Sequence, residues 1–368
     1  MKKILYLFSD TGGGHRAAAN ALISGVEEIA EKKVHQKMID VFAECSDFLG
    51  AISKLYGPII KFTPVVWGKI FSQFNSEGRI DKLIKAARPF LLKDLSKTIQ
   101  SYNPDIIVSV HPLLNHIAVE ARKKIGLHIP IVTVVMDPIT VHKSWICPDI
   151  DLLIVATDEA RETAIEFGMA KEKIRQIGIP IDPRFYEKGD KKAIRKNMKL
   201  NPDLFTILLM GGGEGAGSLF DFAKSIDSAD LAAQLIVVCG KNEKVKKELE
   251  DASLSIPHKI LGFSNNIPDI MDASDLIVTK AGPGAIAEAI TKELPIIIIS
   301  WVPGQEDGNV DFVRNRKIGF VEQDPDEAAS RIKKLLDDRT FDMIKGEVRK
   351  AATPNTTTKI AKEILDQS

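Results

Sequence analysis

Cysteine is scarce and scattered in this sequence. Three occur in 368 residues, at Cys45, Cys147 and Cys239, without a CxxC pair or a cluster of histidines beside them. This spacing argues against a disulfide framework and against a structural zinc site. A reducing compartment, the cytoplasm, suits such a chain better.

Long hydrophobic runs and net charge are lacking as well. No stretch approaches the ~18 consecutive apolar residues that cross a bilayer, and the apolar run at 4–8 is too short for a signal peptide. Fifty basic residues balance fifty acidic ones, so no overall field favours nucleic acid as a partner. We expect a protein that is soluble or peripheral on the cytoplasmic face of a membrane.

Short β-branched runs alternate with longer amphipathic stretches along the chain. The runs lie at 4–8, 37–41, 105–110, 130–136 and 152–157, and then at 205–210, 235–240, 275–280 and 295–300. Such alternation is typical of parallel sheets covered by helices on both faces. We predict an α/β protein of two doubly wound, Rossmann-like domains, joined near 177–192, where two prolines precede a charge run.

Residues 42–100 interrupt this alternation. Between Lys54 and Lys97 there are nine Lys/Arg and three Asp/Glu. Aromatic residues are interleaved with them at Tyr56, Phe62, Trp67, Phe71, Phe74 and Phe90. One interpretation is a helical insertion whose aromatics complete a core. The other is a surface segment that dips aromatics into a bilayer while basic residues meet anionic headgroups.

The first glycine-rich turn, SDTGGGHR at 9–16, joins a predicted strand to a predicted helix. Glycines allow a tight turn there and bring backbone N–H groups close to a ligand. These glycines are Gly12, Gly13 and Gly14. With Ala17 they also fit a dinucleotide fingerprint, and Asp40 ends the next strand, so a dehydrogenase is one alternative.

The histidine after these glycines favours another function. His15 would crowd a pyrophosphate, whereas an imidazole at a strand–helix turn can take a proton from a hydroxyl. His15 as a helix cap or a local packing residue is the simpler alternative.

Two more glycine-rich turns follow strands in the second half. GGGEGAGS at 211–218 includes Gly211, Gly212 and Gly213, and five glycines within seven positions favour close approach of a phosphate. KAGPGAIAEA at 280–289 would present backbone N–H groups at a helix N-terminus to an anion. Glu288, one turn into that helix, can accept hydrogen bonds from a ribose diol. A pair with Lys292 is the alternative for Glu288.

Taken together, these motifs resemble the monogalactosyldiacylglycerol synthase and processive diacylglycerol glucosyltransferase family. The resemblance is carried by SDTGGGHRAAA, GGGEGAGS, CGKN, TKAGPGAIAEA and PGQEDGNV, in that order over most of residues 1–320. Asp137, His142 and Trp145 resemble that family's D-x4-H-x2-W stretch. More distantly, the second half is similar to the lipid-linked peptidoglycan N-acetylglucosaminyltransferase. Asp307 departs from the plant members, which tend to have a basic residue in this loop.

The resemblance implies a GT-B fold, with two Rossmann-like domains facing across a cleft. The implied domains are an acceptor domain at 1–180 with a membrane-facing insertion near 50–97, a donor domain at 181–350, and a helix at 351–368 that crosses back. The implied reaction is inverting transfer of galactose or glucose from a UDP-hexose to the free hydroxyl of 1,2-diacylglycerol at an anionic membrane surface. It implies no cofactor and no metal for the chemistry.

The roles implied by the resemblance can be assigned residue by residue. His15 is the base, Glu288 binds ribose, and Phe263 lies near uracil. Gln305, Glu306 and Asn309 face the hexose. The diphosphate region is lined by Gly211, Gly212, Gly213, Lys280, Gly282, Pro283 and Gly284. The acceptor region has Gly12, Gly13, Gly14, Asp137, His142 and Trp145.

Other functions remain open from the sequence. They are a UDP-N-acetylglucosamine-dependent transferase acting on another lipid-linked acceptor, a nucleotide-sugar epimerase, and a non-catalytic UDP-sugar sensor. Asp149 and Asp151 have DxD spacing, but the proline before them favours the entry of a strand over a metal site. The sequence does not indicate an oligomeric state.

Overall fold

The computed structural model describes residues 1–10, 13–30, 32–51, 68, 73, 75, 77–213, 215, 218–337 and 339–367. Gly12 and five of the aromatic residues of the predicted membrane-facing insertion, at positions 56, 62, 67, 71 and 74, lie outside these ranges. The chain divides into two compact units. Unit 1 comprises residues 1–183, 302–308 and 355–368, and unit 2 comprises residues 184–301 and 309–354.

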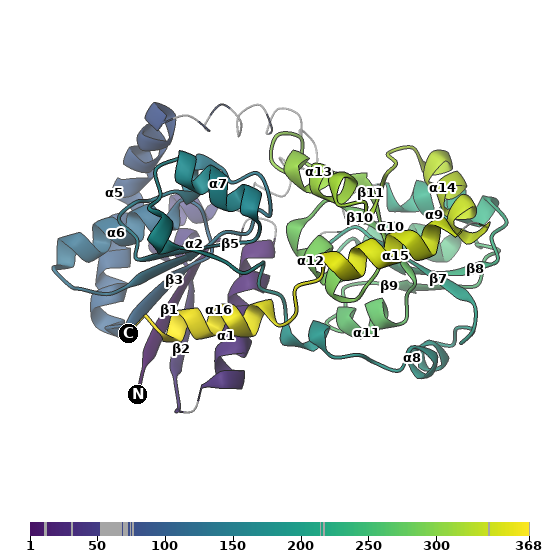
Figure 1. The fold of residues 1–368 in the computed structure, drawn as a ribbon, viewed down its shortest axis with the longest axis horizontal. Coiled ribbons are helices and arrows are strands. Elements are labelled where there is room, and N and C mark those ends of the chain that lie inside the picture. Colours follow the sequence, from purple (N-terminus) through teal and green to yellow (C-terminus); the bar gives the residue numbers. More distant parts are fainter. Residues whose placement is uncertain are drawn as a thin grey trace. The chain divides into compact units, whose positions relative to one another are not determined.

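Unit 1 is built on a six-stranded parallel sheet in the order β2-β1-β3-β4-β5-β6 (Figure 1). Its strands are β1 (Lys3–Phe8), β2 (His35–Asp40), β3 (Ile106–Ser109), β4 (Ile131–Val134), β5 (Leu152–Val155) and β6 (Ile174–Gln176). Its helices are α1 (Gly14–Ile29), α2 (Val41–Cys45), α5 (Glu77–Tyr102), α6 (Leu114–Ile125), α7 (Asp158–Glu166) and α16 (Thr356–Leu365), with short 3-10 turns η1 (Lys143–Trp145) and η2 (Lys171–Lys173). A third such turn, η3 (Pro183–Tyr186), begins at Pro183 and continues into unit 2.

Unit 2 repeats this design with a second six-stranded parallel sheet, in the order β12-β11-β10-β7-β8-β9. Its strands are β7 (Phe205–Met210), β8 (Ala233–Val238), β9 (His258–Leu261), β10 (Leu276–Lys280), β11 (Ile296–Ser300) and β12 (Gly319–Val321). Its helices are α8 (Lys191–Asn197), α9 (Leu219–Ser228), α10 (Glu243–Asp251), α11 (Ile267–Asp272), α12 (Pro283–Thr291), α13 (Asp307–Asn315), α14 (Pro325–Asp337) and α15 (Thr340–Ala351).

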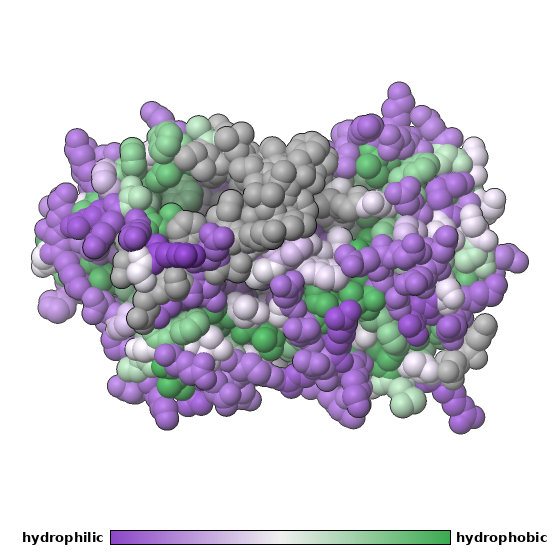
Figure 2. Space-filling model, turned by 90° about the horizontal axis from the view of Figure 1, so that it is seen from above, coloured by the Kyte–Doolittle hydropathy of each residue, from purple (hydrophilic) through white to green (hydrophobic). Residues whose placement is uncertain are grey.

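The burial of the strands follows their place in the sheet. β3, β4, β5 and β8 are buried along their whole length, because helices cover both faces of a parallel sheet. The edge strands β2, β9 and β12 are only partly buried. On the face seen in Figure 2, hydrophobic side chains lie in small groups among hydrophilic ones. The prediction of two doubly wound Rossmann-like domains is confirmed.

The short strands β6 and β12 are not among the predicted strands. Each has three residues, and neither is a buried β-branched run. They are edge strands that pair with β5 and β11, and this pairing stabilises their extended conformation. Their sequences alone do not predict them.

The strand order creates a switch point in each sheet. From β1 the chain adds β2 on one side and β3 on the other, and from β7 it adds β8 on one side and β10 on the other. At such a point the loops leave neighbouring strands in opposite directions, which opens a crevice at the carboxyl ends of the strands. The loop after β1 and the loops after β7 and β10 are the glycine-rich turns found in the sequence.

The C-terminal helix α16 belongs to unit 1 and lies beside α1 (Figure 1). The buried Thr357 holds it in place, because its Oγ1 donates to Ile181 O at 2.6 Å and accepts from Ile181 N at 2.9 Å. Gly25 of α1 faces the same threonine. A Cβ at Gly25 would lie 2.7 Å from Thr357 Cγ2 and 3.3 Å from its carbonyl oxygen.

We predict that Gly25→Ala loosens this contact and lowers the free energy of unfolding by ~1–3 kcal/mol, the usual cost of overpacking. The two hydrogen bonds to Ile181 prevent Thr357 from rotating its methyl group away. Gly346→Ala in α15 is the matched control, since nothing lies within 4 Å of a Cβ there, and a helical Gly→Ala change should stabilise by ~0.5–1 kcal/mol. Urea unfolding measures the free energy of unfolding of each variant. Equal values for the two variants would contradict the prediction.

Candidate active site

In unit 1, chemically active side chains follow the three neighbouring strands β1, β3 and β4. His15 lies in the first turn of α1 after β1, His111 follows β3, and Asp137 follows β4. Because the strands are parallel, their carboxyl ends meet at one edge of the sheet. The switch point between β1 and β3 therefore brings these three residues together.

His15 is held by a hydrogen bond to the backbone after β3. Its Nδ1 lies 2.6 Å from Val110 O. A carbonyl oxygen only accepts, so Nδ1 carries the proton and Nε2 of the neutral ring is the acceptor. Among the described residues Nε2 has no hydrogen-bond partner. The bond to Val110 thus orients the ring and leaves its basic nitrogen available.

Burial lowers the pKa of His15 to about 4, although the bond to Val110 and the charge of Asp10 act in the opposite direction. An imidazole with that pKa is neutral at pH 7. It is in the correct protonation state to take a proton from a ligand hydroxyl. The simpler interpretation, that His15 only caps the helix, does not account for this orientation, because Gly13 is the N-cap residue of α1.

A second histidine, His111, packs against the first. The ring centroids of His15 and His111 are 4.9 Å apart, and Phe42 meets His111 edge-on at 5.2 Å. His111 is 5% exposed, and burial, followed by the neighbouring His15, lowers its pKa well below the ordinary value. His111 is not among the site residues predicted from the sequence. Its signal was a histidine placed directly after the predicted strand at 105–110.

Asp137 and Trp145 form a pair beside the histidines. Trp145 Nε1 donates to Asp137 Oδ2 at 2.7 Å, and the indole ring, 1% exposed, lies 6.2 Å from the His15 ring. Burial raises the pKa of Asp137 to about 7, against the effect of the Trp145 bond. The structure thus brings together Asp137 and Trp145 from the predicted D-x4-H-x2-W stretch.

His142, the third member of that stretch, has a local role in the structure. Its Nδ1 lies 2.7 Å from Ser144 Oγ and accepts from Ser144 N, so it caps the turn η1. The buried Asn115 donates to Trp145 O at 2.7 Å, and this bond ties the turn to α6. Asn115 therefore helps to position Trp145, which the sequence did not reveal.

The glycine turn after β1 is braced by charged residues. Gly13 has a φ of 82°, a conformation that suits glycine, and nothing lies within 4 Å of a Cβ at Gly13 or Gly14. Arg16 binds Asp10 Oδ2 at 3.0 Å, and Asp10 N donates to Asp40 Oδ2 at 3.2 Å. Asp40 thus supports this loop, which differs from the ribose contact that a dinucleotide fingerprint requires.

In unit 2, the glycine turn after β7 packs on the loop after β8. Gly212 O accepts from Gly215 N at 3.0 Å, and Gly213 O accepts from Lys241 N at 2.9 Å. Gly240 has a φ of 57°, and a Cβ there would collide with the Gly213 carbonyl. Nothing lies within 4 Å of a Cβ at Gly213 itself, so a ligand can approach the backbone at that point. Gly211 begins this turn directly after β7.

Lys280 lies between the two glycine turns of unit 2. A Cβ at Gly212 would be 3.4 Å from Lys280 Cε, and one at Gly282 would be 3.3 Å from it. Gly282 caps α12, Pro283 is its first residue, and a Cβ at Gly284 would meet open space. A lysine beside a helix N-terminus is an arrangement that binds phosphate.

Glu288 lies one turn into α12 and is partly exposed. The simpler interpretation paired it with Lys292. In the structure Lys292 Nζ instead binds Asp272 Oδ2 at 2.6 Å and Glu187 O at 2.5 Å. An ion pair with Lys292 therefore does not orient the Glu288 side chain.

Three predicted sugar contacts lie near the end of β11. Glu306 is buried and accepts from Val302 N at 2.8 Å, which closes its own loop, and Gln305 precedes it in the same loop. Asn309 is also buried and donates to Ala281 O at 2.8 Å. Asn309 therefore supports the turn before α12, a role that its sequence pattern did not suggest.

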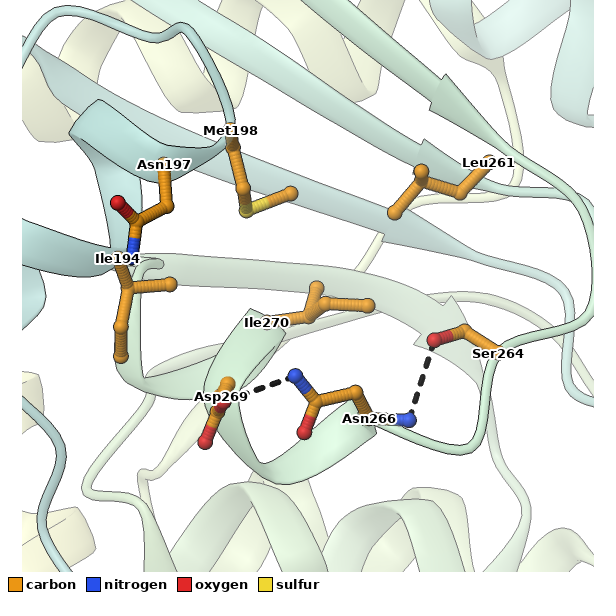
Figure 3. Close-up of a pocket in the computed structure, with 8 residues that line it drawn as sticks. All are labelled: Ile194, Asn197, Met198, Leu261, Ser264, Asn266, Asp269 and Ile270. Atoms are coloured by element: carbon orange, nitrogen blue, oxygen red, sulfur yellow. Dashed lines mark hydrogen bonds between the residues drawn. The ribbon is translucent and has the colours of Figure 1, made fainter.

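Phe263 follows β9, and its side chain is 59% exposed. A cavity of about 260 Å³ lies nearby, lined by residues of α8, α11 and the end of β9: Ile194, Asn197, Met198, Leu261, Ser264, Asn266, Asp269 and Ile270 (Figure 3). Asn266 spans its floor, with N donating to Ser264 Oγ and Nδ2 to Asp269 Oδ2. None of the predicted site residues lines this cavity, so we do not assign it to the glycine turns.

Asp149 and Asp151, at the predicted start of a strand, each form a salt bridge. Asp149 pairs with Lys123, and Asp151 pairs with Arg122. Among the described residues, no group of three or more His, Cys, Asp or Glu side chains is arranged to hold a metal ion. In the same part of the chain, no helix is both long and apolar enough to cross a membrane.

We predict that His15 stays neutral, with its proton on Nδ1, down to about pH 4. Histidine-selective ¹⁵N NMR across a pH titration measures both properties, and His15→Gln assigns the resonance. The nearby ionisable groups are Asp10 and His111, and burial outweighs the effect of the carboxylate. A midpoint near the ordinary pKa of ~6.5, or a proton on Nε2, would contradict this description of the site.

Sequence comparisons extend over both units. Residues 15–181 match the monogalactosyldiacylglycerol (MGDG) synthase family, and residues 206–366 match the glycosyltransferase family 28 C-terminal domain. A probable monogalactosyldiacylglycerol synthase 2 of Oryza sativa subsp. japonica is 34% identical over 99% of this chain and 80% of its own length. Monogalactosyldiacylglycerol synthase 2 of Arabidopsis thaliana is 32% identical over 100% of this chain and 81% of its own length.

Solved structures with low sequence identity share the fold. MurG of Acinetobacter baumannii superposes with a TM-score of 0.64 at 14% identity, and Anabaena Alr3699/HepE in complex with UDP-glucose with 0.60 at 18%. Each comparison covers 100% of both chains. These neighbours have the GT-B fold of glycosyltransferases. With two parallel-sheet units of this kind and relatives above 30% identity over its whole length, the chain belongs to the monogalactosyldiacylglycerol synthase family of glycosyltransferases.

Proposed function

We propose that this enzyme transfers a hexose, galactose or glucose, from a UDP-hexose to the free hydroxyl of 1,2-diacylglycerol with inversion at the anomeric carbon. Relatives at 32–34% identity are named for the galactosyl product of diacylglycerol, and a structural neighbour is a complex with UDP-glucose. The observation that carries the proposal is His15, a neutral imidazole oriented by Val110 with an available Nε2.

In the proposed reaction, the acceptor hydroxyl donates its hydrogen bond to His15 Nε2. As the hydroxyl oxygen attacks the anomeric carbon, its proton passes to Nε2 and the bond between that carbon and the diphosphate oxygen breaks. Val110 O holds the Nδ1 proton throughout, so it stabilises the imidazolium that forms. The positive charge on His15 exists only after proton transfer, because burial keeps the resting ring neutral.

The leaving diphosphate would bind in unit 2. The N–H groups of α12 around Gly284 and the Lys280 side chain supply positive potential there, and in this proposal they replace a metal as the groups that neutralise the charge. Gly213 lets the diphosphate approach the backbone. Glu288 would accept hydrogen bonds from the ribose hydroxyls, and the backbone at Phe263 would meet uracil.

The hexose would meet the loop after β11 through Gln305. Glu306 and Asn309 contribute indirectly, since they hold the backbone of this loop and of the turn before α12. The acceptor would meet the side of unit 1 where Asp137, Trp145 and Gly14 lie. The buried Trp145 ring packs beside His15, and Asp137 fixes the indole orientation.

We further propose that unit 1 binds the anionic surface of a membrane. Phe48 and Phe90 are 58% and 46% exposed, and their rings lie 5.4 Å apart. Lys82 and Lys85 are exposed on α5, while Ile84 and Leu91 of the same helix are buried. Exposed aromatic rings, together with exposed lysines on the helix that carries Phe90, suit the interface between headgroups and acyl chains. The three cysteines are free and buried, which suits a reducing compartment such as the cytoplasm.

The proposed activity predicts a glycolipid product when the protein is incubated with diacylglycerol vesicles and a panel of UDP-sugars. Mass spectrometry of the lipid fraction identifies the donor that is used. His15→Ala should lower turnover by ~10²–10⁴, the usual contribution of a general base, and should leave UDP affinity nearly unchanged. His128→Ala, at an exposed position after α6, is the control.

Two outcomes would overturn the assignment. Full turnover by His15→Ala would remove the base from the mechanism. An isomerised sugar nucleotide without any lipid product would favour an epimerase.

Replacing both exposed rings, with Phe48→Ser and Phe90→Ser together, should weaken binding to vesicles of phosphatidylcholine and phosphatidylglycerol by about tenfold or more. Each buried phenyl ring contributes ~1.5–3 kcal/mol. Met343→Ser, which removes a 72% exposed apolar side chain from α15 in unit 2, should change binding little. Co-sedimentation with vesicles measures the binding. Equal binding by the wild type, the double variant and Met343→Ser would exclude the aromatic pair as an anchor.

A further inference from the structure

His111 has an unpaired hydrogen-bond donor inside the proposed acceptor site. Its Nδ1 accepts from Leu113 N at 3.3 Å, so in the neutral ring the proton is on Nε2. Among the described residues Nε2 has no partner, although the side chain is only 5% exposed. A donor that has no acceptor in the described protein and whose ring packs on the proposed base points to an acceptor atom supplied by the ligand.

The two imidazoles of this site have opposite hydrogen-bonding roles. His15 Nε2 accepts, because Val110 holds its Nδ1 proton, whereas His111 Nε2 donates. Their ring centroids are 4.9 Å apart. One small group with a hydroxyl and a nearby oxygen acceptor could therefore satisfy both rings. A glycerol hydroxyl with an ester on the adjacent carbon has this pattern.

We propose that His111 is a specificity-determining residue whose Nε2–H donates a hydrogen bond to an ester carbonyl oxygen of the acceptor lipid. The inference rests on the proposed function and adds to it the chemical class of acceptor that the site selects. A lipid with acyl esters satisfies His111 when its hydroxyl meets His15. A lipid with ether-linked chains presents the same hydroxyl and the same tails, but it leaves the His111 donor unpaired.

The test compares 1,2-diacylglycerol with 1,2-dialkylglycerol of matched chain length, at equal mole fraction in the same vesicles. Wild-type kcat/KM should favour the diacyl lipid by about tenfold or more, since a site built to donate a hydrogen bond rejects an analogue without the acceptor. His111→Phe should bring the ratio close to one, mainly through loss of activity on the diacyl lipid. His111→Gln, which retains an N–H donor, should preserve part of the preference.

The control variant is His128→Phe, which should keep the wild-type ratio. Wild-type protein that uses both lipids equally would overturn the inference and leave the proposed function intact. The inference also fails if His111→Phe lowers activity on both lipids by the same factor. That result is expected if His111 only packs against Phe42 and makes no hydrogen bond to the lipid. Because the wild-type comparison needs no variant, poor folding of His111→Phe does not remove the test. Absence of any lipid product from wild-type protein contradicts the proposed function itself.

Discussion

The site in each unit depends on one constraint, that all strands of a sheet run parallel and their carboxyl ends share an edge. Residues far apart in sequence then meet at that edge. His15 and His111 are 96 positions apart by their numbers, yet they adjoin because β1 and β3 are neighbours. In unit 2, β7 and β10 are neighbours for the same reason, and their glycine turns share Lys280. The strand order, more than any single motif, assembles the chemistry.

The strand–loop–helix element has a different chemical role in each unit. After β1 the helix begins with a glycine pair and an imidazole, and the loop is braced by Arg16, Asp10 and Asp40. After β10 the helix begins with Gly-Pro-Gly, where a Cβ at Gly284 would meet open space and Lys280 lies beside Gly282. The first arrangement suits proton transfer, and the second suits binding of an anion.

Burial gives the unit 1 site its protonation states. It lowers the pKa of His15 and of His111, and it raises that of Asp137 to about 7. At neutral pH both rings are therefore uncharged, and hydrogen bonds to Val110 and Leu113 select which nitrogen carries each proton. A neutral, oriented pair avoids the cost of two adjacent positive charges in a desolvated site. In the proposed reaction, neither ring carries a positive charge until His15 takes up the proton of the acceptor hydroxyl.

The sequence by itself determined the features that depend on local pattern. Buried β-branched runs predicted the central strands, and the glycine turns at 9–16, 211–218 and 280–289 predicted strand–helix junctions, because those signals arise within one segment. Only the tertiary structure showed that His111 packs on His15, that Trp145 donates to Asp137, and that Asn309 supports Ala281. Such pairs depend on which strands become neighbours in the sheet. The sequence of a short segment does not determine which distant residue it will contact.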